Sequence, residues 1–178
     1  MGERQVVESY ARQVATFRPM AEQVRSSARS RLVWFVALSG FVILNGKALW
    51  DPIAQVSFTG LPLALLVCPW VIAALAAVVT HFMIDEAGVK DDIYATKKAA
   101  SIDLYLESLD EGDADPREMV AIINDSRDDL KEPKRVSERY GYLAQRLERI
   151  TFLIIVVGFV WSFIGPFILA RCTTPISP

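Results

Sequence analysis

The sequence has few of the residues on which most enzyme and metal chemistry depends. Its 178 residues include two cysteines and one histidine, and Cys68 and Cys172 form neither a zinc motif nor a CxxC pair. It has no phosphate-binding glycine loop, no GxSxG and no HExxH. A net charge of −2 provides no broad basic surface of the kind that binds nucleic acid. We therefore expect no enzyme activity, no catalytic or metal-binding residue, no cofactor and no nucleic-acid partner.

Charged side chains are also nearly absent from three long apolar runs, which cover residues 32–50, 61–84 and 150–171. A helix needs about 20 such residues to cross a bilayer. No charged residue lies deep inside any of the three runs, and this argues against a proton relay or an ion-coupled pump. The pattern predicts three transmembrane helices, with the first two forming a hairpin over residues 31–84.

The first run is the weakest of the three. Its strongly apolar part, Leu32–Leu44, is short for a span and reaches sufficient length only if the helix continues to Trp50. Lys47 would then snorkel to the lipid headgroups, and Trp34 and Trp50 would lie in aromatic belts. The alternative is a re-entrant or tilted segment.

Turn signals at Asp51–Pro52 and Thr59–Gly60 separate the first run from the second. We expect Pro69 to kink the second helix, because proline lacks a backbone N–H. Small side chains on one face of this run would let another helix approach closely; they are Ala73, Ala74, Ala76 and Ala77.

Two polar regions, residues 1–30 and 85–149, hold most of the charge, and both show helical periodicity. In the first region an apolar stripe over Val7–Phe17 predicts a helix that packs on other helices, with a kink or break at Phe17–Pro19. Its polar face mixes glutamate with arginine, whereas a membrane-surface helix would be more purely basic.

In the second polar region, residues 89–109 and 116–131 are each predicted to form an amphipathic helix. Asp115, Pro116 and Glu118 fit the N-cap, first and capping-box positions of the latter.

A longer helix is predicted from Lys134 to Arg171, beginning just after Pro133. Its first half carries an apolar stripe whose residues step by four and three along the chain. The stripe consists of Val136, Tyr140, Leu143, Leu147 and Ile150. We expect this half to pack in a cytoplasmic helical bundle, while the half that follows Ile150 lies in lipid. Gly158 and Gly165–Pro166 in that second half would act either as a hinge or as sites of kinking and close helix packing.

The basic residues predict an orientation. Six of the 19 Lys and Arg precede residue 32 and 11 lie between residues 85 and 149. Because basic residues accumulate on the cytoplasmic side, we expect an inner (plasma) membrane protein with a cytoplasmic N-terminus. Residues 1–30 and 85–149 would then be cytoplasmic, and the tail at 172–178 would lie outside.

Three polar residues in or beside the runs are candidate functional positions: Asn45, His81 and Asp85. Asn45 would serve either in helix contacts or at the membrane interface, or else in a pore or ligand site. His81 and Asp85 share a helix face and would form either a proton-responsive pair, half of a metal site, or simply an interfacial polar cap.

The sequence therefore predicts an all-α integral membrane protein with three transmembrane helices and an antiparallel cytoplasmic bundle. Its expected partners are the lipid bilayer and either further copies of itself or a cytoplasmic protein. The preferred hypothesis is that the protein has a non-catalytic role in interaction, assembly or sensing. The alternatives are an oligomeric channel or membrane-permeabilising effector and, less favoured, a membrane-anchored enzyme.

Reporter fusions test the predicted orientation. A reporter that is active only outside the inner membrane should be active when fused after Pro178, and it should be silent when inserted beside Gly112 in the acidic turn. The expectation follows from the 17 Lys and Arg on one side of the three runs. The opposite pattern would reverse the topology.

Overall fold

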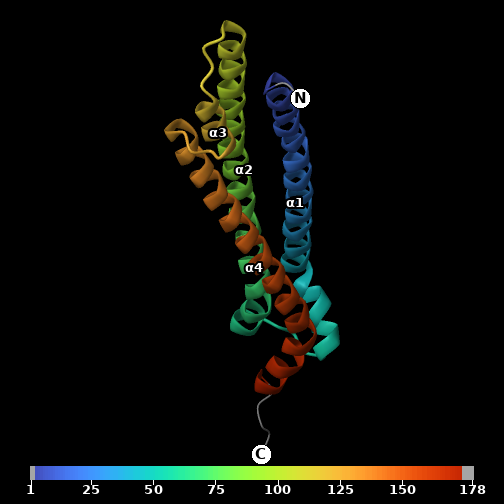
Figure 1. Cartoon of the computed structure of the whole chain (residues 1–178). Coiled ribbons are helices and arrows are strands. Elements are labelled where there is room, and N and C mark those ends of the chain that lie inside the picture. Colours follow the sequence, from blue (N-terminus) through green and yellow to red (C-terminus); the bar gives the residue numbers. More distant parts are fainter. Residues whose placement is uncertain (1–2, 174–178) are drawn as a thin grey trace, which may run out of the picture. The chain divides into compact units, whose positions relative to one another are not determined.

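The structure is a computed structural model that describes residues 3–173, and within these residues it contains helices and loops but no strand. Figure 1 labels its four helices. They are α1 (Glu3–Ala54), α2 (Gly60–Glu111), α3 (Pro116–Ile123) and α4 (Asp128–Thr173). The predicted all-α class is confirmed, and so is the presence of three helices that are long and apolar enough to cross a membrane.

The chain forms two compact units that share the three long helices. Unit 1 comprises residues 3–28 and 83–144, and unit 2 comprises residues 29–82 and 145–173. Unit 1 therefore contains the first half of α1, the second half of α2, all of α3 and the start of α4. Unit 2 contains the three apolar runs, except for the last two residues of the second.

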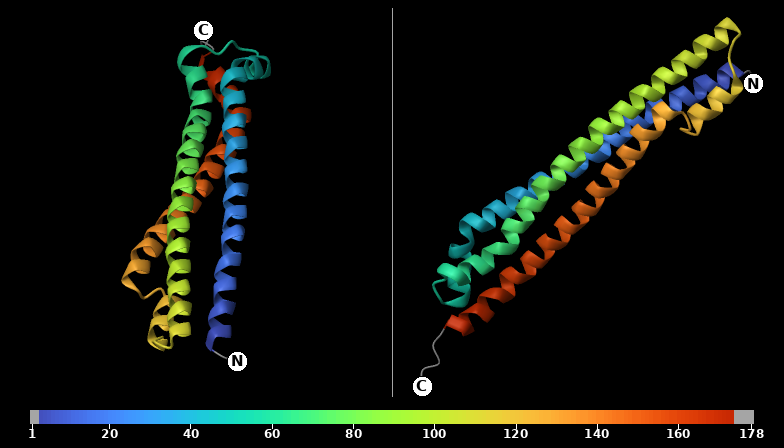
Figure 2. Two further views of the ribbon diagram at one scale, coloured as in Figure 1. Left: turned by 90° about the horizontal axis from the view of Figure 1, so that it is seen from above. Right: turned by 90° about the vertical axis from the view of Figure 1, so that its left-hand side faces the viewer.

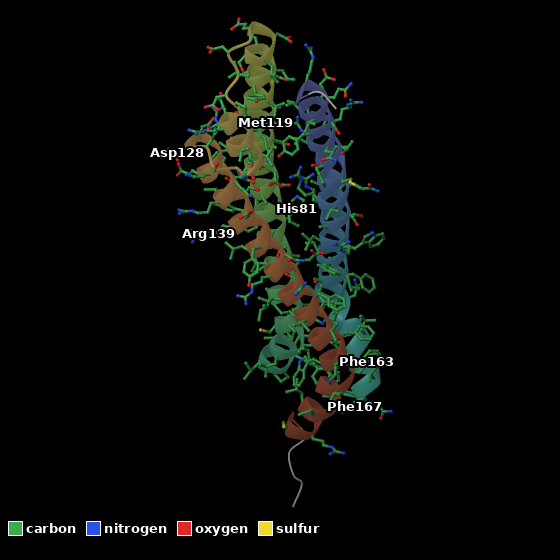
Figure 3. The ribbon with its side chains drawn as sticks, viewed as in Figure 1. His81, Met119, Asp128, Arg139, Phe163 and Phe167 are labelled. Atoms are coloured by element: carbon green, nitrogen blue, oxygen red, sulfur yellow. The ribbon has the colours of Figure 1, made fainter. Side chains whose placement is uncertain are left out.

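In unit 1, α1 and α2 run antiparallel and side by side, as both views of Figure 2 show. An ion pair joins α1 to α2 near each end of this paired segment: Arg4 pairs with Asp110, and Arg25 pairs with Asp91. The apolar core joins α1, α2 and α3, and Figure 3 labels its α3 member Met119. The buried members are Val7, Ile102, Tyr105, Met119 and Ile122.

Unit 2 has an apolar core in the middle and apolar side chains on the outside. Its core contains Val42, Trp50, Phe58, Leu66, Trp70, Ala73 and Ile155. Exposed apolar side chains occur on all three helices, including Trp34 on α1, Leu75 on α2 and Phe163 on α4, and Figure 3 labels Phe163 and Phe167. A surface of this kind suits a lipid environment.

Helix α2 has a packing face with a strict spacing. From Leu66 to Tyr105, one row of buried or half-buried residues alternates steps of four and three. These residues are Leu66, Trp70, Ala73, Ala77, Thr80, Ile84, Ala87, Asp91, Tyr94, Lys98, Ser101 and Tyr105. An average step of 3.5 residues is the coiled-coil repeat, which keeps one helix face against its neighbours. Two residues of the predicted small-residue face, Ala73 and Ala77, are fully buried, and Ala74 and Ala76 are half-buried.

The predicted packing stripe of α4 is confirmed only in part, because Val136, Tyr140 and Leu147 are half-buried. Leu143 and Ile150 are 38% and 49% exposed. One series of buried positions recurs every seven residues and carries mostly small side chains: Leu130, Ser137, Ala144, Thr151, Gly158 and Gly165. Ile155 and Pro166 are buried as well. Small residues let helix backbones approach closely, so the larger apolar side chains are displaced to the flanks of the contact.

Gly158 and Gly165 serve this close packing. A Cβ at Gly158 would lie 3.5 Å from Pro69 and Trp70, and one at Gly165 would lie 2.9 Å from Leu66. These distances favour the packing interpretation of the two glycines over the hinge.

Two predicted helix boundaries in unit 1 are also wrong. The helix expected over 116–131 ends as α3 at Ile123, and α4 already begins at Asp128 rather than after Pro133. Pro133 lies in the second turn of α4, where a missing N–H costs only one intrahelical hydrogen bond. The predicted start of α3 matches the structure, because the Asp115 carboxylate accepts a hydrogen bond from the backbone N–H of Arg117 at 2.8 Å.

Prolines elsewhere also fail to end helices. Helix α1 continues through Pro19 and through Asp51–Pro52 to Ala54, and α2 continues through Pro69. The loop between α1 and α2 therefore spans only residues 55–59. At the far end α4 includes Cys172, and the remainder of the predicted tail, 174–178, lies outside the described residues.

Trp50 and Lys47 lie at the end of α1, where the membrane boundary was predicted. Trp50 is 2% exposed and belongs to the core of unit 2, so the prediction of an aromatic belt fails for this residue. Lys47 turns to the loop, where it pairs with Asp51 at 3.0 Å and donates to Ser57 and to the Phe58 carbonyl. Trp34, which is 72% exposed, keeps a position compatible with lipid.

The burial of Trp50 depends on Gly46, one turn earlier in α1. A Cβ at residue 46 would lie 2.4 Å from the Trp50 ring. We therefore expect Gly46→Ala to force Trp50 from its site and to destabilise the protein by about 1–3 kcal/mol, as overpacking does in other cores. Thermal unfolding of the full chain in detergent, followed by tryptophan fluorescence, measures the effect.

Gly40→Ala is the matched control in the same helix, because a Cβ there meets no atom within 4 Å. It should leave stability unchanged or raise it slightly, since alanine favours a helix over glycine. Equal destabilisation by the two variants would contradict the role of Gly46.

Candidate functional site: a buried polar network in unit 1

The packing face of α2 changes character between the two units. Its positions in unit 2 are apolar apart from Thr80, whereas unit 1 places Asp91, Tyr94, Lys98 and Ser101 at successive packing positions. Lys98 is only 6% exposed and Ser101 only 3%. Buried charges are costly unless they are paired and hydrogen-bonded, so this part of the helix requires specific partners.

Asp125 supplies the central partner. Its Oδ1 accepts hydrogen bonds from Lys98 Nζ at 2.6 Å and from the Tyr94 hydroxyl at 2.5 Å, while its Oδ2 accepts from Lys134 Nζ at 2.8 Å. The side chains of Lys98 and Asp125 are each 8% exposed. One carboxylate therefore joins α2, the α3–α4 turn and α4.

The backbone of Asp125 explains why α3 ends where it does. Asp125 has φ +51°, in the left-handed region that Asp tolerates better than most residues. Its N–H bonds the Ile122 carbonyl and the next N–H, from Ser126, bonds the Ala121 carbonyl. The turn thus satisfies the last carbonyls of α3 and directs the Asp125 carboxylate to the two lysines.

Aromatic rings complete the surroundings of Lys98. Its ammonium nitrogen lies 5.4 Å from the ring centre of Tyr10 on α1 and 5.5 Å from that of Tyr94. Both distances are within the range of cation–π attraction. The same nitrogen donates to the Tyr94 hydroxyl at 3.1 Å, so Lys98 connects α1 to the network.

The network favours the charged form of its ionic members. Burial acts against the charge of Lys98, but hydrogen bonds to Asp125, Tyr10 and Tyr94 outweigh it and raise the pKa of Lys98. Burial likewise opposes the charge of Asp125, yet the bonds from Lys134 and Lys98 lower its pKa. Burial and the Asp125 bond raise the pKa of the Tyr94 hydroxyl, which stays protonated as a donor.

A second set of polar contacts surrounds Asp91. Its Oδ2 accepts from Arg25 of α1 at 2.8 Å, and its Oδ1 accepts from the Ser137 hydroxyl of α4. Arg25 also pairs with Glu22 at 3.0 Å, and its side chain is only 11% exposed. Asp91 therefore connects all three long helices within unit 1.

Next to both sets lies a cavity of about 340 Å³ between α1 and α2. Its walls are mainly apolar or aromatic, and the polar groups that reach it include Arg25, Asp91, Tyr94 and Lys98. A volume of this order is typical of small-molecule sites. The cations at its edge are already paired with carboxylates, so the arrangement holds helices together and offers no unshared charge to a substrate.

The predicted candidate positions lie elsewhere. Asn45 is exposed, and its amide donates to the Phe41 carbonyl of its own helix at 2.9 Å. His81 belongs to unit 2 (Figure 3), where it borders an apolar cavity of about 380 Å³ with residues such as Leu32 and Phe82. Asp85 is half-buried in unit 1. No group of three or more possible metal-ligating side chains occurs within residues 3–173.

Sequence reasoning missed the network because its members are spread over α2, a turn and α4. One signal was present: Asp91, Tyr94 and Lys98 continue the four-three spacing of the apolar residues before them. Polar residues that keep a packing period indicate a buried polar layer rather than a solvated face. Asp125 gave no such signal, since it occupies a turn.

Removing the central carboxylate tests the network. Asp125→Asn should lower stability at neutral pH by roughly 3 kcal/mol, because it leaves two lysines without their buried counter-charge. Since Asp125 has a lowered pKa in the folded chain, its contribution is present above its ordinary pKa of 3.8 and is lost as the pH falls below it. The variant should therefore lose less stability than wild type between neutral pH and pH 3.

Asp103→Asn is the control for this measurement, because Asp103 is an exposed carboxylate on α2 of the same unit. Its effect on thermal unfolding in detergent should stay below about 0.5 kcal/mol. An Asp125 variant as stable as the Asp103 variant would show that the network does not hold unit 1 together.

Comparisons of the chain with protein-family models, with curated proteins and with solved structures found no match. No family-level assignment of activity follows for this chain. Its function is inferred from its own residues.

Proposed function

We propose that this chain is a non-catalytic, multi-pass inner-membrane protein whose unit 1 is a cytoplasmic module for interaction or assembly. The three long apolar helices support insertion, and the excess of Lys and Arg before the first run and between the second and third supports a cytoplasmic unit 1. The exposed apolar surface of unit 2 agrees with a lipid environment.

The observation that carries the interaction role is an apolar surface on the polar unit. In unit 1, Phe17, Met20 and Val24 of α1 are 67%, 64% and 69% exposed. Every residue from Ala15 to Val24 is exposed, although this segment is helical and includes Pro19. A lone helical segment gains little stability in water, since most helical stability in proteins comes from packing. The segment is thus suited to receive a partner.

The polar network supports a structural role for the charged residues of unit 1. Asp125 pairs with both Lys98 and Lys134, and Arg25 pairs with Asp91. These contacts join α2, the α3–α4 turn, α4 and α1, while Phe17, Met20 and Val24 of α1 stay exposed. An exposed apolar helix face is what helix-in-groove recognition uses.

The channel alternative receives less support. The middle of unit 2 is filled by large side chains, among them Trp50, Leu66 and Trp70, each at most 2% exposed. A pore would therefore have to form between several copies of the chain. Release of dye from lipid vesicles by the purified protein would favour that alternative.

Photo-crosslinking in native membranes tests the interaction role. A photoreactive phenylalanine analogue placed at Phe17, Met20 or Val24 should yield protein adducts, because a partner covers these side chains. The same analogue at Ser26, which is exposed on another face of α1, should yield few. Absence of protein adducts at all three positions would remove the interaction role.

A further inference from the structure

We propose that the occupant of the exposed face of α1 is a second copy of the same chain, packed as a parallel two-helix coiled coil. This inference rests on the proposed interaction role of unit 1 and names its partner. It concerns a face of α1, here termed the α1 stripe, that consists of Val6, Tyr10, Gln13, Phe17, Met20, Val24 and Ser27.

The α1 stripe has the spacing of a coiled-coil core. Its members alternate steps of four and three over 22 residues, or about 32 Å of helix at 1.5 Å per residue. All of them except Tyr10 are exposed. Helix α2 packs mainly on the adjoining side of α1, where Val7 and Ala28 are buried and Arg25 meets Asp91. The stripe borders that side, since Tyr10, Gln13 and Phe17 also line the cavity between α1 and α2.

Charge explains why a second copy fits this face. If Tyr10, Phe17 and Val24 take the a positions of heptads, then the d, e and g positions are also uncharged throughout. The g positions are Ser9, Thr16 and Gln23, and the e positions are Val7, Val14, Ala21 and Ala28. Every charged residue between Arg4 and Arg29 falls at b, c or f, namely Arg4, Glu8, Arg12, Arg18, Glu22, Arg25 and Arg29.

A face without charge can meet its own copy without repulsion. In a parallel pair, the a and d residues of one helix face the same residues of the other helix, and the e and g residues flank this contact. A charged residue at any of these positions would therefore lie at or beside the interface with the identical charge of the second copy. Chains inserted in one membrane with one orientation present α1 in the same direction, and a two-fold axis then brings Phe17, Met20 and Val24 against their counterparts. An acidic or basic partner would gain nothing from this face.

The arginines of α1 argue against a lipid occupant. A surface-bound helix uses basic side chains to attract anionic headgroups, but Arg4, Arg18 and Arg25 already pair with Asp110, Asp92 and Asp91 of α2. These pairs hold the basic side of α1 against its own chain and leave the uncharged side outward.

Cysteine crosslinking of the full chain in membranes tests the second copy. In a background of Cys68→Ser and Cys172→Ser, both of which replace exposed free thiols, Met20→Cys and Val24→Cys should each form a disulfide-linked dimer on mild oxidation. Ser26→Cys is the matched control, because it is exposed on α1 at a c position, and its dimer yield should be several-fold lower.

A charge-introducing variant gives an independent measurement. Phe17→Asp with Val24→Asp should weaken self-association of the detergent-solubilised chain on the order of 100-fold, because like charges then face each other across the interface. The two side chains are exposed within one chain, so far-UV circular dichroism should stay unchanged. Ser26→Asp should leave self-association as in wild type.

Three results would contradict the proposal that a second copy packs on the α1 stripe. They are equal dimer yields from Met20→Cys and Ser26→Cys, no dimer from either Met20→Cys or Val24→Cys, and self-association unaffected by the paired aspartates. If one of these results is found and the photoreactive group at Phe17 crosslinks to a protein of different mass, then unit 1 binds a different protein and the interaction role stands. If no protein adduct forms at all, both the interaction role and the second copy are rejected.

Discussion

The four-three spacing of the packing face of α2 is the constraint on which the rest of the structure depends. It continues from Leu66 to Tyr105 without interruption, so a single helix presents a packing face in each unit. A face with this average step stays turned toward its neighbours over many turns. The contacts that α1 and α4 make with α2 in each unit follow from it, including Thr80 with Thr151 in unit 2 and Arg25 with Asp91 in unit 1.

The side chains at the packing positions of α2 are mostly apolar in unit 2 and partly charged in unit 1, and the two kinds of side chain stabilise the fold in different ways. Unit 2 buries Leu66, Trp70 and Ala73, which need no partner beyond close contact. Unit 1 buries Lys98 and Asp125, which stabilise the fold only in one arrangement, because displacing either leaves a buried charge uncompensated. The network therefore selects one path for the α3–α4 turn among those that an apolar core would accept.

The sequence determined the helical class, the three apolar helices and the helix start at Asp115, because periodicity, run length and capping are local properties. It also predicted an apolar packing stripe over Val7–Phe17, of which Val7 is buried and Tyr10 and Val14 are half-buried, whereas Phe17 is exposed. None of these predictions depends on which helices are neighbours in the folded chain. Prolines misled where a break was predicted: α1 continues through Pro19 and α4 already includes Pro133, so the loss of a hydrogen bond at each proline does not end these long helices.

Only the tertiary structure decided which face of α4 is buried and where the charged residues meet. Hydropathy favoured Leu143 over Ala144, but the close approach of two backbones selects small residues and places Ala144 inside. Lys98 and Asp125 are 27 residues apart with a helix and two turns between them. Their pairing depends on the left-handed backbone of Asp125 and on the position of α4, which no local pattern in the sequence encodes.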